Sequence, residues 1–421
     1  MSEAGMAMDK PARLEIDGLL DDPATRIIVC CGSGGVGKTT TAAALGVRAA
    51  ERGRRAVVLT IDPARRLAQS MGIDSLDNTP RKVAGVGGAG EGEGNGDPAD
   101  SGELHAMMLD MKRTFDEIVE GHTDRERAEA ILANPFYQSL SAGFAGTQEY
   151  MAMEKLGQLR ARDDWDLIIV DTPPSRSALD FLDAPKRLGS FLDGKFIRVL
   201  MAPAKVGGRA GMKFLNVGMS MMTGTLSKLM GASLLKDVQT FVAAMDTMFG
   251  GFRTRADATF RLLQAPGTAF LVVAAPEPDA LREAAYFVER LAAERMPLAG
   301  LVLNRVHGSD ADRLSAERAL AAAENLEEGG IVDQESGKAG LRDDDRSSPD
   351  ADVDEITAGL LRLHAERMQV IAREQRTRDR FTSLHPEVAV AEVAALPGDV
   401  HDLAGLRAIG ERLAAGVPAG A

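Results

Sequence analysis

Short apolar runs recur along the chain, and their pattern predicts the fold. They are rich in β-branched residues and cover residues 26–31, 56–61, 167–170, 269–273 and 298–304. Runs without polar alternation are typical of strands in a parallel sheet that is covered on both faces. Helical patterns follow most of them, for example Thr39 to Glu51 and Pro278 to Glu294. Since right-handed crossovers are the default connection, we expect an α/β fold with a mainly parallel sheet flanked by helices.

Two polar segments interrupt this pattern. Residues 83–103 are mostly Gly, Glu, Asp and Ala, and residues 327–352 are similarly acidic. Such compositions bury too little apolar area to offset the entropy cost of ordering. We therefore expect a flexible insertion at 83–103, an acidic flexible segment at 327–352 and a long helix from Glu355 to about Arg378. The rest is predicted to be an N-terminal extension, residues 1–24, and a single domain, residues 25–421.

Charge and cysteine content disfavour several classes of protein. The formal net charge is −13, and phosphate backbones repel such a chain, so no nucleic acid is expected as a partner. The two cysteines, Cys30 and Cys31, are adjacent in an apolar run, which leaves no disulfide framework and no CxxC zinc site. We read them as inert core residues. No apolar run suits a membrane span or a signal peptide, and we expect a cytoplasmic protein.

A glycine-rich run follows the first apolar segment and opens the first helical pattern. Residues 32–39 read GSGGVGKT and match the phosphate-binding pattern G-x-x-x-x-G-K-[ST]. Glycines let successive backbone N–H groups converge on phosphate oxygens at a helix N-terminus. Lys38 is expected to bind the β- and γ-phosphates, and Thr39 to ligate Mg²⁺. A turn that binds nothing would have no use for this Lys-Thr pair. The predicted nucleotide-binding residues are Gly34, Gly35, Val36, Gly37, Lys38, Thr39 and Thr40.

Residues 32–40 also resemble the deviant loop G-K-G-G-x-G-K-[ST] of a family that includes arsenite-transport, tail-anchored-protein targeting, MinD- and ParA-type ATPases. The resemblance covers about Thr25 to Leu413 and implies that the domain has a P-loop NTPase fold that binds ATP or ADP with Mg²⁺. The family's signature lysine, which reaches across a dimer to the partner's nucleotide, falls at Ser33 here. Because a hydroxyl cannot supply that charge, we expect a dimer, with a paralogue that retains the lysine favoured over a second copy.

Two acidic residues resemble switch elements of the arsenite and tail-anchor branch. Residues 60–67, TIDPARRL, resemble its T-D-P-A-H-x-L segment. Asp62 is there a candidate to orient the attacking water and to hold the metal's water shell. The alternative is an N-cap for a helix beginning at Pro63, and both can hold.

Asp171 ends the apolar run 167–170 and has the form of a Walker B acid, a catalytic and Mg²⁺-binding candidate. The following Thr172-Pro173-Pro174 resembles the start of the branch's D-T-A-P-T-G-H-T switch, but Arg176-Ser177-Ala178 replaces its G-H-T. The sensing of hydrolysis is therefore expected to differ. A plain strand end with turn-forming prolines is the alternative.

Two later positions match the adenine site of the same branch. Asn304 ends the run 298–304, and its amide offers both a donor and an acceptor to an adenine edge. Pro397 lies in residues 394–400, AALPGDV, which resemble the loop under the adenine ring. An Asn at a strand end is otherwise often a turn residue.

Methionines concentrate in the middle of the chain, where eight fall between Arg198 and Phe252. The resemblance places an inserted helical subdomain here, residues 195–265, which forms a client groove in the tail-anchor branch. Flexible thioether side chains suit varied apolar partners. An ordinary helical core or dimer contact with Met as gap-filler is the alternative.

The leading hypothesis is an ArsA-like ATPase in which nucleotide closes a dimer, hydrolysis opens it, and the helical insertion changes its affinity for an apolar client. Arsenite transport is disfavoured because the metalloid cysteines have no counterpart. Alternatives are a low-turnover nucleotide-dependent scaffold and an ion- or anion-pump-associated ATPase. A partitioning ATPase that binds DNA or membrane is disfavoured by the acidic charge and by the weakly charged helix expected at Leu403 to Ala415.

Overall fold

The structure is a computed structural model, and it describes residues 12–61, 66–73, 75–87, 102–135, 137–138, 147–173, 254–329 and 349–415. Several predictions lie outside these residues: Asp62, Pro174, the segment 176–178, residues 195–253 of the Met-rich region, and the middles of the two polar segments, 88–101 and 330–348. Residues 254–263, the end of the Met-rich region, are helical.

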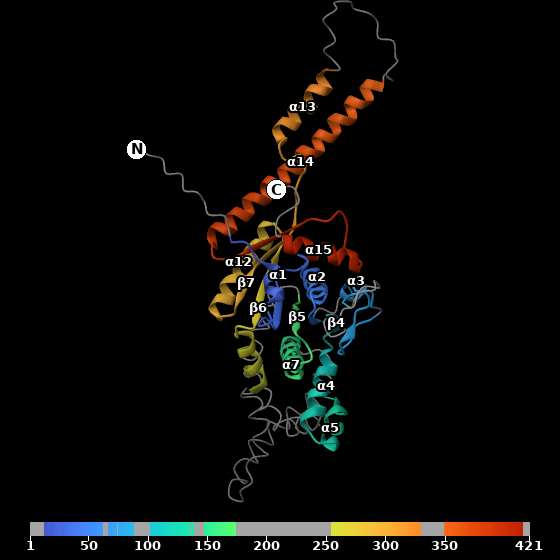
Figure 1. The fold of residues 1–421 in the computed structure, drawn as a ribbon, viewed down its shortest axis with the longest axis vertical. Helices are drawn as coiled ribbons and strands as arrows, with labels where there is room; N and C mark the ends of the chain where they lie inside the picture. Colours follow the sequence, from blue (N-terminus) through green and yellow to red (C-terminus); the bar gives the residue numbers. More distant parts are fainter. Residues whose placement is uncertain are drawn as a thin grey trace, which may run out of the picture.

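The described strands form one eight-stranded sheet in the order β3-β4-β2-β5-β1-β6-β7-β8, parallel throughout except for the β3–β4 pair (Figure 1). β1 lies between β5 and β6, so the loop that follows β1 leaves from the middle of the sheet. The strands are β1 (Ile27–Cys31), β2 (Arg55–Thr60), β3 (Arg81–Lys82), β4 (Glu103–Met108), β5 (Leu167–Asp171), β6 (Thr268–Ala274), β7 (Leu298–Val306) and β8 (Val390–Ala394).

Helices cover both faces of the sheet, as the apolar runs predict. Alternate residues of β1 point to opposite sides: Ile27 and Val29 join one core, and Ile28 and Cys30 join the other. The second core is closed by α1 (Ile16–Asp21), α2 (Lys38–Glu51), α3 (Arg66–Ser70) and α15 (Leu403–Ala415). The first is closed by α4 (Met111–His122), α5 (Arg125–Leu132), α7 (Thr147–Arg162) and α12 (Pro278–Ala293). The result is a three-layer α/β fold.

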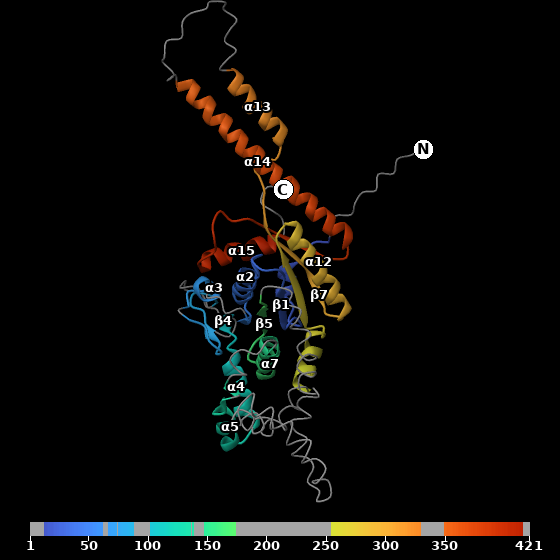
Figure 2. The ribbon, with the colours of Figure 1, turned by 180° about the vertical axis from the view of Figure 1, so that it is seen from behind.

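Two further helices form an arm that projects from the sheet. α13 (Ala316–Gly329) lies beside α14 (Pro349–Leu384), and both views show the pair extending away from the body (Figures 1 and 2). α14 has 36 residues and is longer than the predicted helix at both ends. Ala358 and Ala365 are buried and lie one heptad apart. Within the described residues, no helix combines the length and the hydropathy that a membrane crossing needs.

The five apolar runs are all strands, and the helices predicted at Thr39 to Glu51, Pro278 to Glu294 and Leu403 to Ala415 are confirmed. Three strands were not predicted: β3, β4 and β8. The polar segment 83–103 also begins inside packed structure, because Val83 and Val86 are buried and the Val83 amide donates to the Leu104 carbonyl at 2.9 Å.

Candidate functional site

The loop between β1 and α2 follows a path that only glycines allow. Gly32 has φ +147°, and a Cβ there would lie 2.0 Å from the carbonyl oxygen of Val273 on β6. Gly37 is the N-cap of α2 with φ +95°, and a Cβ there would lie 2.2 Å from Asn304 Nδ2. The loop is therefore pressed between its two neighbours, and side chains at these positions would displace it.

The opposite side of the loop is open. Gly34 and Gly35 are exposed, and a Cβ added at Gly35, with φ +78°, would meet nothing within 4 Å. No side chain caps the N-terminus of α2, and its first turn carries no acidic residue. The helix therefore offers N–H groups and the positive end of its dipole toward this opening, an arrangement that suits an anion.

Lys38 folds back over the loop that precedes it. Its side chain is 5% exposed, and Nζ donates to the Ser33 carbonyl at 2.7 Å. An ammonium group held this way has its position fixed by the loop, so its charge is already placed beside the glycine-lined opening. The carbonyl of Ser33 thus positions the catalytic candidate Lys38.

Asp171 connects the loop to two neighbouring strands. It is fully buried at the end of β5, and its Oδ2 accepts hydrogen bonds from Thr39 Oγ1 at 2.7 Å and from Thr60 Oγ1 at 2.9 Å. Hydroxyl and carboxylate oxygens are the ligands that Mg²⁺ takes from proteins. Thr39 and Asp171, brought together beside the phosphate-binding loop, therefore fit a Mg²⁺ ion accompanied by a nucleotide.

Three residues around this acid were not predicted as site residues. Thr60, the last residue of β2, lies directly beside Asp171 in the parallel register. Thr172 Oγ1 donates to the Cys30 carbonyl at 2.8 Å and fastens the end of β5 to β1. Gln148 on α7 donates to the Ile61 carbonyl at 2.9 Å. The one signal visible in the sequence was the hydroxyl of Thr60 at the end of an apolar run. Its meaning depends on the strand order, which places β2 beside β5.

Asn304 lies against the phosphate-binding loop. A β-bulge interrupts the β7–β8 pairing at residues 304–306, where Arg305 has φ +62°. Asn304 is 8% exposed, and its Nδ2 donates to the Val36 carbonyl at 2.8 Å. Bulges change the direction of neighbouring side chains. Pro397 is exposed in the loop after β8. Asp62, a further predicted residue, lies outside the described residues.

The adjacent cysteines lie in the sheet beneath the loop. Cys30 is completely buried and Cys31 is 2% exposed. Burial, the largest cause, raises the pKa of Cys30 well above its usual value and that of Cys31 to about 12. Both thiols therefore stay protonated at neutral pH, and the prediction of core residues is confirmed.

Comparison with known proteins agrees with this geometry. The sequence model of the family described as anion-transporting ATPase matches residues 25–328. "ATPase GET3" of Podospora anserina is 25% identical over 312 residues, which cover 72% of this chain and 81% of that protein. "ATPase GET3" of Malassezia globosa is 28% identical over 173 residues, 41% of this chain and 46% of that protein. A "Putative arsenical pump-driving ATPase" of Halobacterium salinarum is 29% identical over 187 residues, 44% of this chain and 27% of that protein.

Proposed function

This chain belongs to the anion-transporting ATPase family and is an ATPase; from that premise we propose that it is an ATP-driven dimeric switch whose nucleotide state controls binding of an apolar client or partner. The observation that carries the proposal is the cluster of Lys38, Thr39 and Asp171 around an open glycine loop. It joins a cation, a hydroxyl and a buried carboxylate where a phosphate chain would enter.

The roles of these residues follow from their positions. The N–H groups of the loop and of the first turn of α2 bind phosphate oxygens, and Lys38 places its charge on the β- and γ-phosphates. Thr39 and Asp171 would hold Mg²⁺, which would supply positive charge to the phosphate oxygens. Thr60 keeps the Asp171 carboxylate turned toward Thr39, because both hydroxyls bond the same oxygen.

Asp62 completes the proposal as the residue that orients the attacking water. The residue before it, Ile61, is hydrogen-bonded through both of its backbone groups. Its carbonyl accepts from the side chain of Gln148, and its N–H donates to the Asp171 carbonyl. The start of this switch segment is thus fixed to the site. We assign the adenine ring to the neighbourhood of Asn304, which lies in β7, and of Pro397, which follows the neighbouring strand β8.

The proposal of a dimer rests on Ser33, the second residue of the loop. Ser33 has a short hydroxyl side chain where the family's signature lysine would stand, and its carbonyl is engaged by Lys38. Because no charge from this position can reach a partner's nucleotide, we propose that the chain pairs with a paralogous ATPase that carries the lysine. The client would bind the Met-rich segment 195–265.

ATP turnover by the chain alone and with the paralogue tests the pairing. We expect low ATP turnover for the isolated chain and higher turnover when the paralogue is added. A Ser33→Lys substitution should partly restore turnover in the absence of the paralogue. Full turnover by the purified chain alone would refute the need for a partner.

A second experiment separates the switch from a low-turnover scaffold. Asp62→Asn should abolish hydrolysis while ATP stays bound, whereas Asp163→Asn should change neither. Asp163 is a suitable control because it is exposed and precedes β5 at the N-terminal ends of the parallel strands, whereas the loop follows the C-terminal end of β1. If wild-type turnover is already as low as that of Asp62→Asn, the scaffold is the better description.

A further inference from the structure

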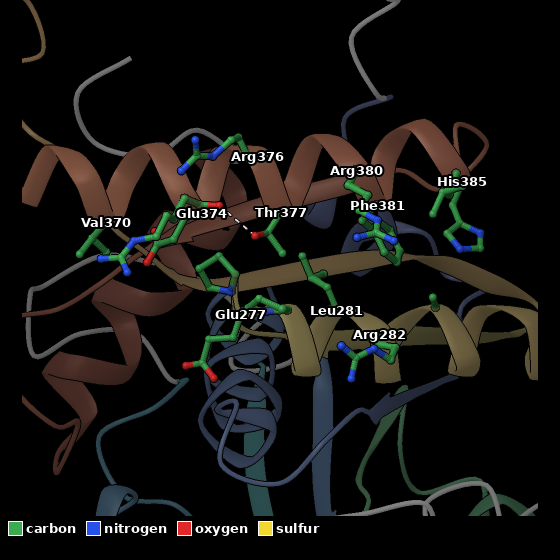
Figure 3. A pocket seen from close by; sticks show the side chains of 15 residues that line it. Glu277, Leu281, Arg282, Val370, Glu374, Arg376, Thr377, Arg380, Phe381 and His385 are labelled. Carbon is green, nitrogen blue, oxygen red and sulfur yellow. Dashed lines mark hydrogen bonds between the residues drawn. The ribbon is translucent and has the colours of Figure 1, made fainter. Parts of the chain in front are cut away.

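A second cavity lies away from the nucleotide site, between α12 and the C-terminal half of α14 (Figure 3). Its volume is about 710 Å³, within the range of pockets that bind small molecules. None of the residues that line it belongs to the phosphate-binding loop or to the Asp171 cluster. The cavity is therefore separate from the nucleotide site.

The floor of the cavity is apolar. Leu281 of α12 and Phe381 of α14 are each 4% exposed and line the space between the two helices. At one end Leu384 is 67% exposed, one of the largest exposures of an apolar side chain in the described residues. An aliphatic ligand lying over these three side chains would remove Leu384 from water and extend the apolar core outward.

The rim is cationic. Arg373 and Arg380 lie two turns apart on one face of α14, the face that also carries Thr377 and Leu384. Neither arginine forms an ion pair with a carboxylate of the described residues; Arg373 Nε donates only to the carbonyl of Gln369, at 3.3 Å. In a chain with a net charge of −13, these two arginines form a local positive rim beside an apolar floor.

The acidic residues of the cavity do not neutralise this rim. The lining contains four arginines, at 282, 373, 376 and 380, against Glu277 and Glu374. Glu374 is turned toward His307, whose backbone N–H donates to it at 2.9 Å and whose Nδ1 lies 2.6 Å from it. Arg282 is paired with Asp279 at 2.8 Å. The charge left to attract a ligand is positive.

From this combination we propose that the cavity binds a single-chain amphiphilic anion, with a phosphate or carboxylate head on Arg380 and Arg373 and an aliphatic tail over Leu281, Phe381 and Leu384. Arginine presents a planar fork that matches both head groups. The floor offers only aliphatic and aromatic contact to the rest of the ligand.

Calorimetric titration of the full chain with dodecyl phosphate, below its micelle concentration, tests the proposal. Saturating Mg-ADP in every titration keeps the phosphate-binding loop from competing. The double variant Arg373→Gln/Arg380→Gln should weaken binding by about tenfold to a hundredfold, because two charge-assisted contacts are lost. Arg318→Gln, at an exposed arginine of α13 outside the cavity, should bind like the wild type.

Further titrations test the tail and the source of the anion. Leu384→Ser should weaken dodecyl phosphate binding several-fold and leave the folding of the chain intact, because this side chain is mostly exposed. Inorganic phosphate should bind at least about tenfold more weakly than dodecyl phosphate, since it cannot use the floor. Dodecanoate should compete with dodecyl phosphate, and dodecyl maltoside, which has a neutral head, should not.

Three results would overturn the proposal. Equal affinity of the arginine double variant and the wild type would exclude the rim as the head site. Equal affinity for inorganic phosphate and dodecyl phosphate would leave an anion site without a tail site. Binding only to an acidic peptide or to vesicles of anionic lipid, with no binding of the monomeric alkyl phosphate, would assign the cavity to a macromolecule. All three readouts are independent of ATP hydrolysis.

Discussion

Replacing single loop glycines with alanine should separate a steric contact from a conformational preference. At Gly32 a Cβ would lie 2.0 Å from the Val273 carbonyl oxygen, about 1 Å inside the 3.0 Å that Cβ atoms keep from their neighbours, and the residue has φ +147°. At Gly35 the added Cβ meets nothing within 4 Å, although φ is +78°. The two substitutions are chemically identical and lie in one loop.

The two variants should lose different amounts of unfolding free energy, because only Gly32→Ala creates a steric clash. Alanine in the left-handed region costs about 1–2 kcal/mol, and Gly35→Ala should lose only that. Gly32→Ala must in addition push β1 away from β6 in the middle of the sheet, and we expect a loss of about 4 kcal/mol or more. Urea unfolding followed by circular dichroism measures both. Equal losses for the two variants, or a Gly32→Ala protein as stable as the wild type, would refute this description of the loop.

Three further outcomes are expected. Asn304→Ala leaves the Val36 carbonyl without its 2.8 Å hydrogen bond and should lower unfolding free energy by about 1–3 kcal/mol; equal losses of ATP and GTP affinity would argue against an adenine contact. Because burial raises the pKa of Cys31 to about 12, neither thiol should react with a disulfide reagent at about pH 8 until urea unfolds the chain. The Arg48 hydrogen bond lowers the pKa of Asp17 below 3.8, so Asp17→Asn should lower the melting temperature at neutral pH. That difference should shrink as the pH falls below 3.8 and the carboxylate protonates; a constant difference would contradict the assignment.

The sequence predicts the centre of this fold better than its edges, for a physical reason. Strands buried on both faces must be apolar at every position, so β1, β2, β5, β6 and β7 stand out as uninterrupted runs. β4 lies near the edge of the sheet and mixes buried with half-buried residues, with polar Glu103 and His105. β3 has two residues, both exposed. Such strands leave no pattern that distinguishes them from a loop.

The candidate site shows the same limit. Lys38, Thr39 and Asp171 were recognisable because the positions around them carry a motif. Thr60 was not, since its contact with Asp171 depends on β2 and β5 being neighbours in register, which no local pattern encodes. The arginine-rimmed cavity was equally invisible: Leu281 and Arg380 are distant in sequence, and only the packing of α14 across α12 brings them together.

The length of α14 has a mechanical consequence. A helix of 36 residues is a rod about 54 Å long. Its C-terminal part is anchored to the body through Phe381, and its other end belongs to the projecting arm (Figure 2). For such a lever, a tilt of about 6° at the anchored end carries the far end through about 5 Å. The arm therefore magnifies small displacements of the sheet at its distal end.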